Sequence, residues 1–448
     1  MRGGEGGHVP IQSSATGGVV VRTGGSLRLA DMNGRVLTAE PLPYLTADHP
    51  GIGGVIKRFD EDFIVEELPL YSPCGAGTHA YFTIEKRGHT TLDAIRIVAG
   101  RLGRKRQEIG YAGLKDAHGV TRQTFSLEHV DPATVAALSF DRIKILGVTR
   151  HTNKLKLGHL AGNRFEIRIR DVARAATERA VAILELLSHR GVPNYFGPQR
   201  FGVRGDNAAI GVAVLRNDYE TAIAHILGRP GPVDHGAIRR ARELFDAGDI
   251  EGAAAAWPGR GFAPQARICR ALIGGGGDAR NAWRAVDHTL RRLYLSAVQS
   301  ELFNRVLVGR IGTIDRLIDG DIAWIHRNGA CFEVLDVAHE QPRCSAFEIS
   351  PTGPLFGRRM KEPAGDAGRL EAEALENAAL NKDQFRATGA GKLNGARRPL
   401  RVPLGGGGAE AGSDQRGPYL RLRFELPAGA YATNVSREIC KVDRLEAE

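Results

Sequence analysis

Alternating apolar and polar residues, which are typical of half-buried β-strands, occur near both ends of this chain and seldom in its middle. Before residue 191 the alternation occurs around Phe63 and Val65, from Ala80 to Ile84, from Gln123 to Leu127 and from Phe165 to Ile169. It returns from Leu420 to Leu426. Since side chains two residues apart lie on one face of a strand, these runs predict sheets with a buried face. Residues 191 to about 400 hold short helical patterns instead, so we expect a separate or inserted domain there.

Turn and cap residues predict where several other segments lie. Helices are expected at about 91–102, 175–190, 218–227, 238–247 and 287–310. The first should begin with Thr90 or Thr91 as its N-cap and end at Gly103. The glycine tract at 405–408, continued to Asp414, predicts a flexible surface loop. Residues 1 to about 45 are rich in Gly and Ser and predict a disordered or loosely attached extension.

The length and composition narrow the class of protein. The 448 residues are too many for one core, so about two or three domains are expected. No stretch approaches the roughly 18 apolar residues of a membrane span, and no apolar signal core is present, so we expect a cytoplasmic protein. The five cysteines lack zinc-ligand spacing and predict reduced thiols. A net charge of +10, with arginine in excess of lysine, favours a nucleic acid as partner.

A single carboxylate, Asp116, lies on a short loop between two strand-like runs. Gly113 and Gly119 bracket this loop, which lets its backbone turn tightly or approach a ligand. The carboxylate could be a nucleophile or a base, or it could merely cap its own Asx turn. The expected helix just upstream ends in four cations that are either a solvated helix end or a surface for a polyanion: Arg101, Arg104, Lys105 and Arg106.

Four segments, in this order, resemble the TruD family of tRNA pseudouridine synthases. They are DFIVEE (62–67), AGLKDAHGVTRQ (112–123), HTNKLKLG (151–158) with LAGNRF (160–165) and VPNYFGPQRFG (192–202), and LPAGAYAT (426–433) running into Arg437 and Glu438. The resemblance covers nearly all of the chain outside the N-terminal extension. It implies a mixed α/β fold with a central mixed sheet in the catalytic domain (46–190 and 401–448) and an inserted family-specific α/β domain (191–400).

The same resemblance implies the reaction, which is the isomerisation of a uridine in RNA, most often uridine 13 of tRNA, to pseudouridine. The base is detached from C1′, turned while held, and rejoined through C5, so no metal or organic cofactor is expected. The target uridine must leave a stacked RNA, and the site must exclude water. We expect tRNA as the partner, no membrane association, and a monomer without an obligate protein partner.

By the match Asp116 is the nucleophile or the base, and further residues are expected to contact the substrate. Phe63 aligns with an aromatic of the substrate pocket, although its place in a strand also suits an ordinary core residue. Asn163 aligns with a substrate-binding asparagine, whose amide supplies a donor and an acceptor, but a Gly-Asn pair is otherwise typical of a turn. Phe165 is expected to line the site, and its alternation with Ile167 suits a core role equally well.

Tyr431 occupies a substrate-contacting position at which many bacterial relatives have Phe. A phenol keeps the aromatic face for stacking on uracil, but Tyr431 also forms a helical stripe with Val435 and Ile439 that suits core packing. Lys57 is the candidate basic partner of Asp116, or else a surface lysine. We also consider a non-catalytic RNA-binding protein on the same fold, and a hydrolase that uses Asp116 and His118 as an acid–base pair.

Overall fold

The computed structural model of the chain describes residues 20–23, 26–29, 42–172, 175–386, 393–442 and 445. For the first two ranges it gives the backbone, a hairpin of β1 (Val20–Thr23) and β2 (Ser26–Leu29). The rest of the predicted extension up to residue 41 lies outside the described residues. Leu45 and Thr46 are buried, and each backbone amide donates to the Glu438 carboxylate over 3.0 Å. The folded body therefore begins before residue 46, within the last residues of the predicted extension.

The alternating runs of both chain ends join in one nine-stranded sheet, in the order β16-β17-β9-β4-β7-β5-β8, with β3 beside β9 and β6 beside β7. Its strands are β3 (Gly53–Val55), β4 (Phe63–Pro69), β5 (His79–Arg87), β6 (Gly110–Tyr111), β7 (Val120–Glu128), β8 (Ile143–His151), β9 (Leu160–Val172), β16 (Gly405–Asp414) and β17 (Gly417–Pro427). The sheet is mixed, because β4 and β7 run parallel while β9 is antiparallel to both β4 and β17. The two ends of the sequence thus build one layer.

The predicted surface loop at 405–414 is wrong, because this segment is strand β16. It pairs antiparallel with β17 from Gly408 opposite Arg423 to Asp414 opposite Gly417. Strand pairing uses backbone groups, which glycine has as fully as any residue, so low side-chain content did not prevent it.

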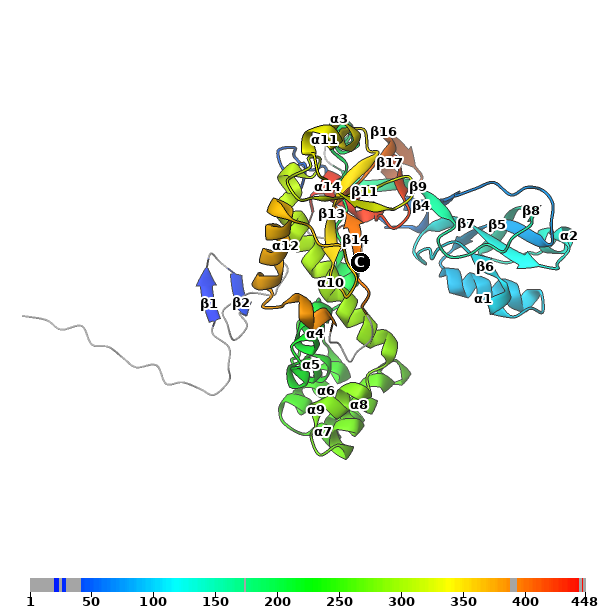
Figure 1. Cartoon of the computed structure of the whole chain (residues 1–448). Helices are drawn as coiled ribbons and strands as arrows, with labels where there is room; N and C mark the ends of the chain where they lie inside the picture. The colour runs from blue at the N-terminus through cyan, green and yellow to red at the C-terminus, as the bar shows by residue number, and fades with distance from the viewer. Residues whose placement is uncertain are drawn as a thin grey trace, which may run out of the picture.

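The helices beside the sheet are α1 (Thr91–Arg101), α2 (Pro132–Ala136), α3 (Ala176–Arg190) and α14 (Ala432–Cys440). The two predicted helices among them are confirmed. Thr90 caps α1 by accepting a hydrogen bond from the Asp93 amide, and Gly103 follows the helix with a φ of 63°. Figure 1 shows α1 with β5, β7 and β8 at one end of the molecule, away from the helices of the chain's middle.

The middle of the chain combines a helical group with a second sheet. Its helices are α4 (Asn207–Leu215), α5 (Tyr219–Leu227), α6 (Gly236–Asp246), α7 (Ile250–Ala256), α8 (Ala263–Gly274), α9 (Ala279–Arg284), α10 (His288–Arg310), α11 (Val337–Ser345), α12 (Gly365–Asn377) and α13 (Lys382–Arg386). The second sheet has the order β12 (Cys331–Glu333), β11 (Ile322–Ile325), β13 (Ile349–Leu355) and β14 (Ala396–Pro399). The three helices predicted here are confirmed as α5, α6 and α10.

Helix α10 is shared by two hydrophobic cores. Leu295, Val298 and Leu302 belong to the core of the helical group, whereas Phe303 and Leu307 belong to the core under the large sheet. In Figure 1 this 23-residue helix runs from the helical group up to the sheets. The two regions are therefore packed through one continuous element.

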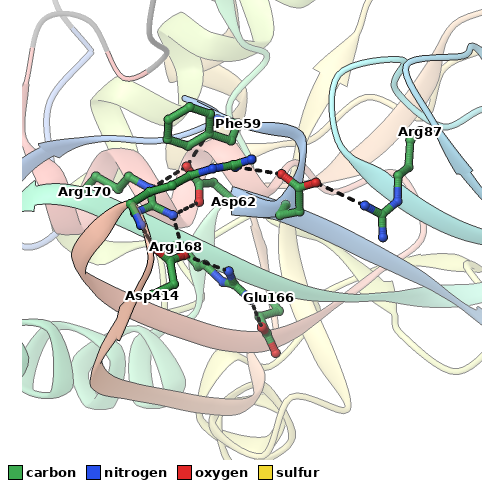
Figure 2. A network of polar contacts seen from close by, with 9 residues as sticks. Phe59, Asp62, Arg87, Glu166, Arg168, Arg170 and Asp414 are labelled. Carbon is green, nitrogen blue, oxygen red and sulfur yellow. Dashed lines mark hydrogen bonds and ion pairs between the residues drawn. The ribbon is translucent and has the colours of Figure 1, made fainter.

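A buried arginine holds the start of β4 against the β16–β17 hairpin. Arg170 on β9 donates to both oxygens of Asp62 (2.7 and 2.8 Å) and to Asp414 (2.8 Å), as Figure 2 shows. Hydrogen bonds from Arg170 lower the pKa of Asp414 to about 2. Since Asp62 directly precedes Phe63, this network positions a strand that contributes to the site described next.

Candidate active site

A cleft of about 1810 Å³ lies between the large sheet, α10 and the segment 196–205. Its lining includes all six residues that the sequence singles out: Lys57, Phe63, Asp116, Asn163, Phe165 and Tyr431. They come from β4, β9 and three connecting segments that are far apart in the sequence. The structure therefore brings every predicted site residue to one place.

Asp116 lies between β6 and β7, and its side chain is 59% exposed to the cleft and solvent. Its Oδ2 lies 3.7 Å from Nζ of Lys57. Within the described residues the carboxylate makes no hydrogen bond to its own loop, so the Asx-turn interpretation is wrong. His118 is exposed and is not bonded to Asp116, which removes the basis for the alternative of a hydrolase acid–base pair.

The side chain of Lys57 is only 9% exposed, and its backbone has a left-handed φ of 56°. Its ammonium lies 4.6 Å from the centroid of the Phe63 ring as well as beside Asp116. A cation over an aromatic face is attracted by the ring quadrupole. The surface-lysine alternative is wrong, and the ion pair and the ring contact together orient both the lysine and the carboxylate.

Phe63 and Phe165 form an aromatic floor of the cleft. Their ring centroids are 6.2 Å apart at an interplanar angle of 54°, and Phe165 stacks on Phe424 at 5.4 Å. Both are buried and belong to the core under the sheet. Each ring therefore lines the pocket and packs in the core, so the two interpretations are compatible. Gly119 has a φ of 132°, and an added Cβ would lie 2.6 Å from the Phe63 carbonyl, so glycine permits this close approach.

Asn163 lies within strand β9, where its backbone is opposite both Glu67 and Leu426. The turn interpretation is therefore wrong. Its side-chain Oδ1 is buried and has no hydrogen-bond partner among the described residues. An unmet buried acceptor costs free energy, so this oxygen is suited to a donor that enters the cleft.

Tyr431 is the residue before helix α14, and 41% of it is exposed. Val435 and Ile439 are fully buried, but Tyr431 is not, so the core-packing interpretation is wrong for the tyrosine. Its ring lies 6.5 Å from that of Phe196, tilted by 57°. Part of the phenol ring is therefore exposed at the cleft, where it can contact a ligand.

Comparisons with known proteins place this chain in a family. The sequence model of tRNA pseudouridine synthase D (TruD) matches residues 41–439. The chain belongs to the TruD family. The tRNA pseudouridine synthase D of Geotalea daltonii is 48% identical over 399 residues, which are 89% of this chain and 99% of that relative. That of Geobacter metallireducens is 49% identical over 401 residues, which are 90% of this chain and 98% of that relative.

A crystal structure from Methanosarcina mazei that carries the same TruD description superimposes with a TM-score of 0.79. The two chains are 26% identical, and the match covers 89% of this chain and 96% of that one. The predicted family and the mixed α/β fold class are thus confirmed. The roles of the individual site residues rest on the geometry above and stay predictions.

Buried polar groups hold the TruD carboxylate loop on both sides of Asp116. Lys115 and Glu67 form a buried ion pair of 3.2 Å, and burial raises the pKa of Glu67. The Lys115 amide donates to Thr91 Oγ1 (2.8 Å). Lys86 donates to the Asp116 carbonyl over 2.8 Å, and burial lowers its pKa to about 8. The loop is thereby fixed while the Asp116 carboxylate stays accessible.

Sequence reasoning missed these supporting groups. A signal for Lys86 was present, because it continues the period of Ala80, Phe82 and Ile84 and so faces the same side of β5. The predicted RNA surface at the end of α1 is not part of the cleft lining. Of its cations, Arg104 is already engaged with the Glu128 carbonyl (2.6 Å) and the Glu108 carboxylate (3.5 Å).

Other expectations concern metals, thiols and membranes. Within the described residues, no group of three or more His, Cys, Asp or Glu side chains could hold a metal ion. All five cysteines are unpaired, and Cys74 is exposed. Among the described residues, none of the helices has both the length and the apolar character needed to cross a bilayer.

Proposed function

We propose that the chain isomerises a uridine of tRNA, uridine 13, to pseudouridine. Family membership supports the reaction and the class of RNA. Position 13 rests on the motif resemblance. The observation that carries the proposal is one accessible carboxylate, paired with a lysine, in a cleft with an aromatic floor.

In this mechanism the Asp116 carboxylate acts at the ribose of the flipped nucleotide. It either attacks C1′ and displaces uracil, or removes a proton from C2′ so that the glycosidic bond breaks. The freed uracil turns within the site, and its C5 bonds to C1′. In the first route this breaks the ester bond between Asp116 and C1′, and in the second route the proton returns from Asp116 to C2′. C5 then loses its proton to a base, and N1, which is no longer bonded to C1′, carries a proton instead, which completes a redox-neutral isomerisation.

Other cleft residues are proposed to hold the base. The ring of Tyr431 stacks on uracil, and Oδ1 of Asn163 accepts the N3–H of the base, which would satisfy a buried acceptor that otherwise has no partner. Phe63 and Phe165 exclude water from the reacting centre. Lys57 acts as a positioning residue through its ion pair with Asp116.

We also propose that residues 46–190 and 401–448 form the catalytic domain and that 191–400 form an inserted domain. A short pairing supports this division, because β10 (Val192–Pro193) lies beside β15 (Arg401–Val402). The proposed insertion thus leaves and re-enters the catalytic part at neighbouring strands.

The test compares Asp116→Asn with wild type on a tRNA that has uridine 13 and on the same tRNA with cytidine 13. Wild type should form one pseudouridine, at position 13, in the first tRNA and none in the second. Asp116→Asn should lose activity by about a thousandfold or more, because the nucleophile or base is gone, while tRNA binding changes little. Asp383→Asn, an exposed carboxylate outside the cleft lining, is the matched control. Turnover by Asp116→Asn would remove Asp116 from catalysis, and modification at another uridine would correct the position.

A further inference from the structure

One arginine in the cleft differs from the others in its charge balance. Four arginines line the cleft. Three of them are ion-paired: Arg204 with Asp206 and Asp234, Arg305 with Glu301, and Arg437 with Glu438. Arg200 has no such pair among the described residues, and its guanidinium makes one hydrogen bond there, from Nε to Ser300 Oγ over 3.1 Å. Both Nη groups of Arg200 are therefore available to a ligand.

A second arginine adds to this unbalanced charge. Arg398 lies 4.3 Å from the centroid of Phe196, and the Arg200 guanidinium lies 5.4 Å from the same ring. Arg398 donates to neutral oxygens of Asn194 and Gly429, and its Nε is buried without a partner. Burial, together with the smaller effect of the Arg200 charge, lowers the pKa of Arg398 to about 10. Two positive charges beside one aromatic ring repel each other, so an anion that binds next to them is favoured.

The anion must suit both the arginines and the rings beside them. Phe196 connects Arg200 to Tyr431, since the ring of Tyr431 lies 6.5 Å from Phe196 and Arg200 lies 5.4 Å from it. One nucleotide can span these two contacts with its base and its phosphate. A guanidinium can also bind two phosphate oxygens at once through its planar fork.

We propose that Arg200 binds a phosphodiester flanking the flipped uridine, with Arg398 supporting it from behind residues 429–431. This inference rests on the proposed RNA substrate. Together the two arginines form a phosphate site at one wall of the cleft, and they fix the ribose of the target nucleotide relative to Asp116. Arg200 is therefore a substrate-binding and positioning residue.

The test asks whether removing the charge of Arg200 and removing the charge of one phosphate have the same effect on tRNA binding. Arg200→Gln and wild type are titrated with the tRNA carrying a neutral methylphosphonate at the linkage 5′ or 3′ of the target uridine. Arg200→Gln should bind the native tRNA about tenfold more weakly and flatten the plot of log affinity against log salt by roughly 0.7 to 0.9. At one of the two linkages the methylphosphonate should weaken tRNA binding by wild type as much as Arg200→Gln does, and it should not weaken binding by Arg200→Gln any further. Arg200→Lys should keep the salt slope and recover part of the affinity.

Arg305→Gln is the matched control, because it removes a cleft arginine whose charge Glu301 already balances. It should leave the coupling to the methylphosphonate intact. If Arg200→Gln and the methylphosphonate weaken binding independently at both linkages, so that their effects multiply, the proposal is overturned. An Arg200→Gln variant with a lower melting temperature but the wild-type salt slope would also overturn it. A wild-type protein that binds tRNA with this coupling but forms no pseudouridine would instead contradict the proposed function alone.

Discussion

The two walls of the cleft satisfy their charges in different ways. In the Asp116 wall (Lys57, Lys115 and Asp116, with Glu67 and Lys86 behind), Lys57 pairs with Asp116, Lys115 pairs with Glu67, and Lys86 donates to the His89 and Asp116 carbonyls. In the Phe196 wall (Phe196, Arg200 and Tyr431, with Arg398 behind), the two cations have no carboxylate partner among the described residues. The first wall is complete before substrate arrives, as preorganised chemistry requires. The second is complete only when an anion binds.

The sharpest way to break this contrast is to unbalance the Asp116 wall. Lys115 and Glu67 are both about 95% buried, so Glu67→Gln should leave an uncompensated ammonium and lower the free energy of unfolding by about 3 to 5 kcal/mol. Denaturant unfolding measures this loss. The double variant Lys115→Met/Glu67→Leu should recover much of the stability, because no buried charge remains. A Glu67→Gln protein as stable as wild type would show that the pair is not essential to the loop.

In the Phe196 wall, substitution should reduce binding rather than stability. Tyr431→Ala should cost about 1 to 3 kcal/mol in the free energy of uridine binding or of single-turnover activation, which is the value of one base–aromatic stack. The melting temperature should change little, because the residue is 41% exposed. Tyr431→Phe keeps the ring and should behave like wild type. If Phe proves as harmful as Ala, the hydroxyl and not the ring makes the contact.

A third effect should depend on pH. Burial lowers the pKa of Lys86 to about 8, whereas an unfolded lysine titrates near 10.4, so the unfolded chain binds more protons between these values. The stability of wild type should therefore rise relative to Lys86→Met as the pH goes from about 8 to above 10. Unfolding by denaturant at pH 7.5, 9 and 10.5 measures the difference. A constant difference would mean that Lys86 titrates alike in both states.

Much of the sheet could be predicted because its strands carry side-chain alternation. The runs around Phe63, Phe125, Ile167 and Leu422 all lie in the nine-stranded sheet. Segment 405–414 could not be predicted, because its glycines carry no pattern and its strand identity comes from pairing with β17. Local composition is informative about side-chain burial and silent about a distant backbone partner.

The candidate site was predictable where residue types match a motif and obscure where tertiary contacts decide. Asp116 and its pairing with Lys57 were anticipated. Asn163 has the local sequence of a turn, but strands β4 and β17 on its two sides hold it extended. Arg200 lay in a quoted motif without a role, because its lack of a carboxylate partner becomes visible only when the neighbours of every cleft arginine are known.

Helix α10 has a consequence for how the molecule comes apart. Its first half contributes Leu295 and Val298 to the helical group, and its second half contributes Phe303 and Leu307 to the core under the sheet. Melting either core would strip the other of side chains from the same helix, and helix formation is itself cooperative along the chain. The large sheet and the helical group should therefore denature as one cooperative unit, with a single calorimetric transition, although they carry separate cores.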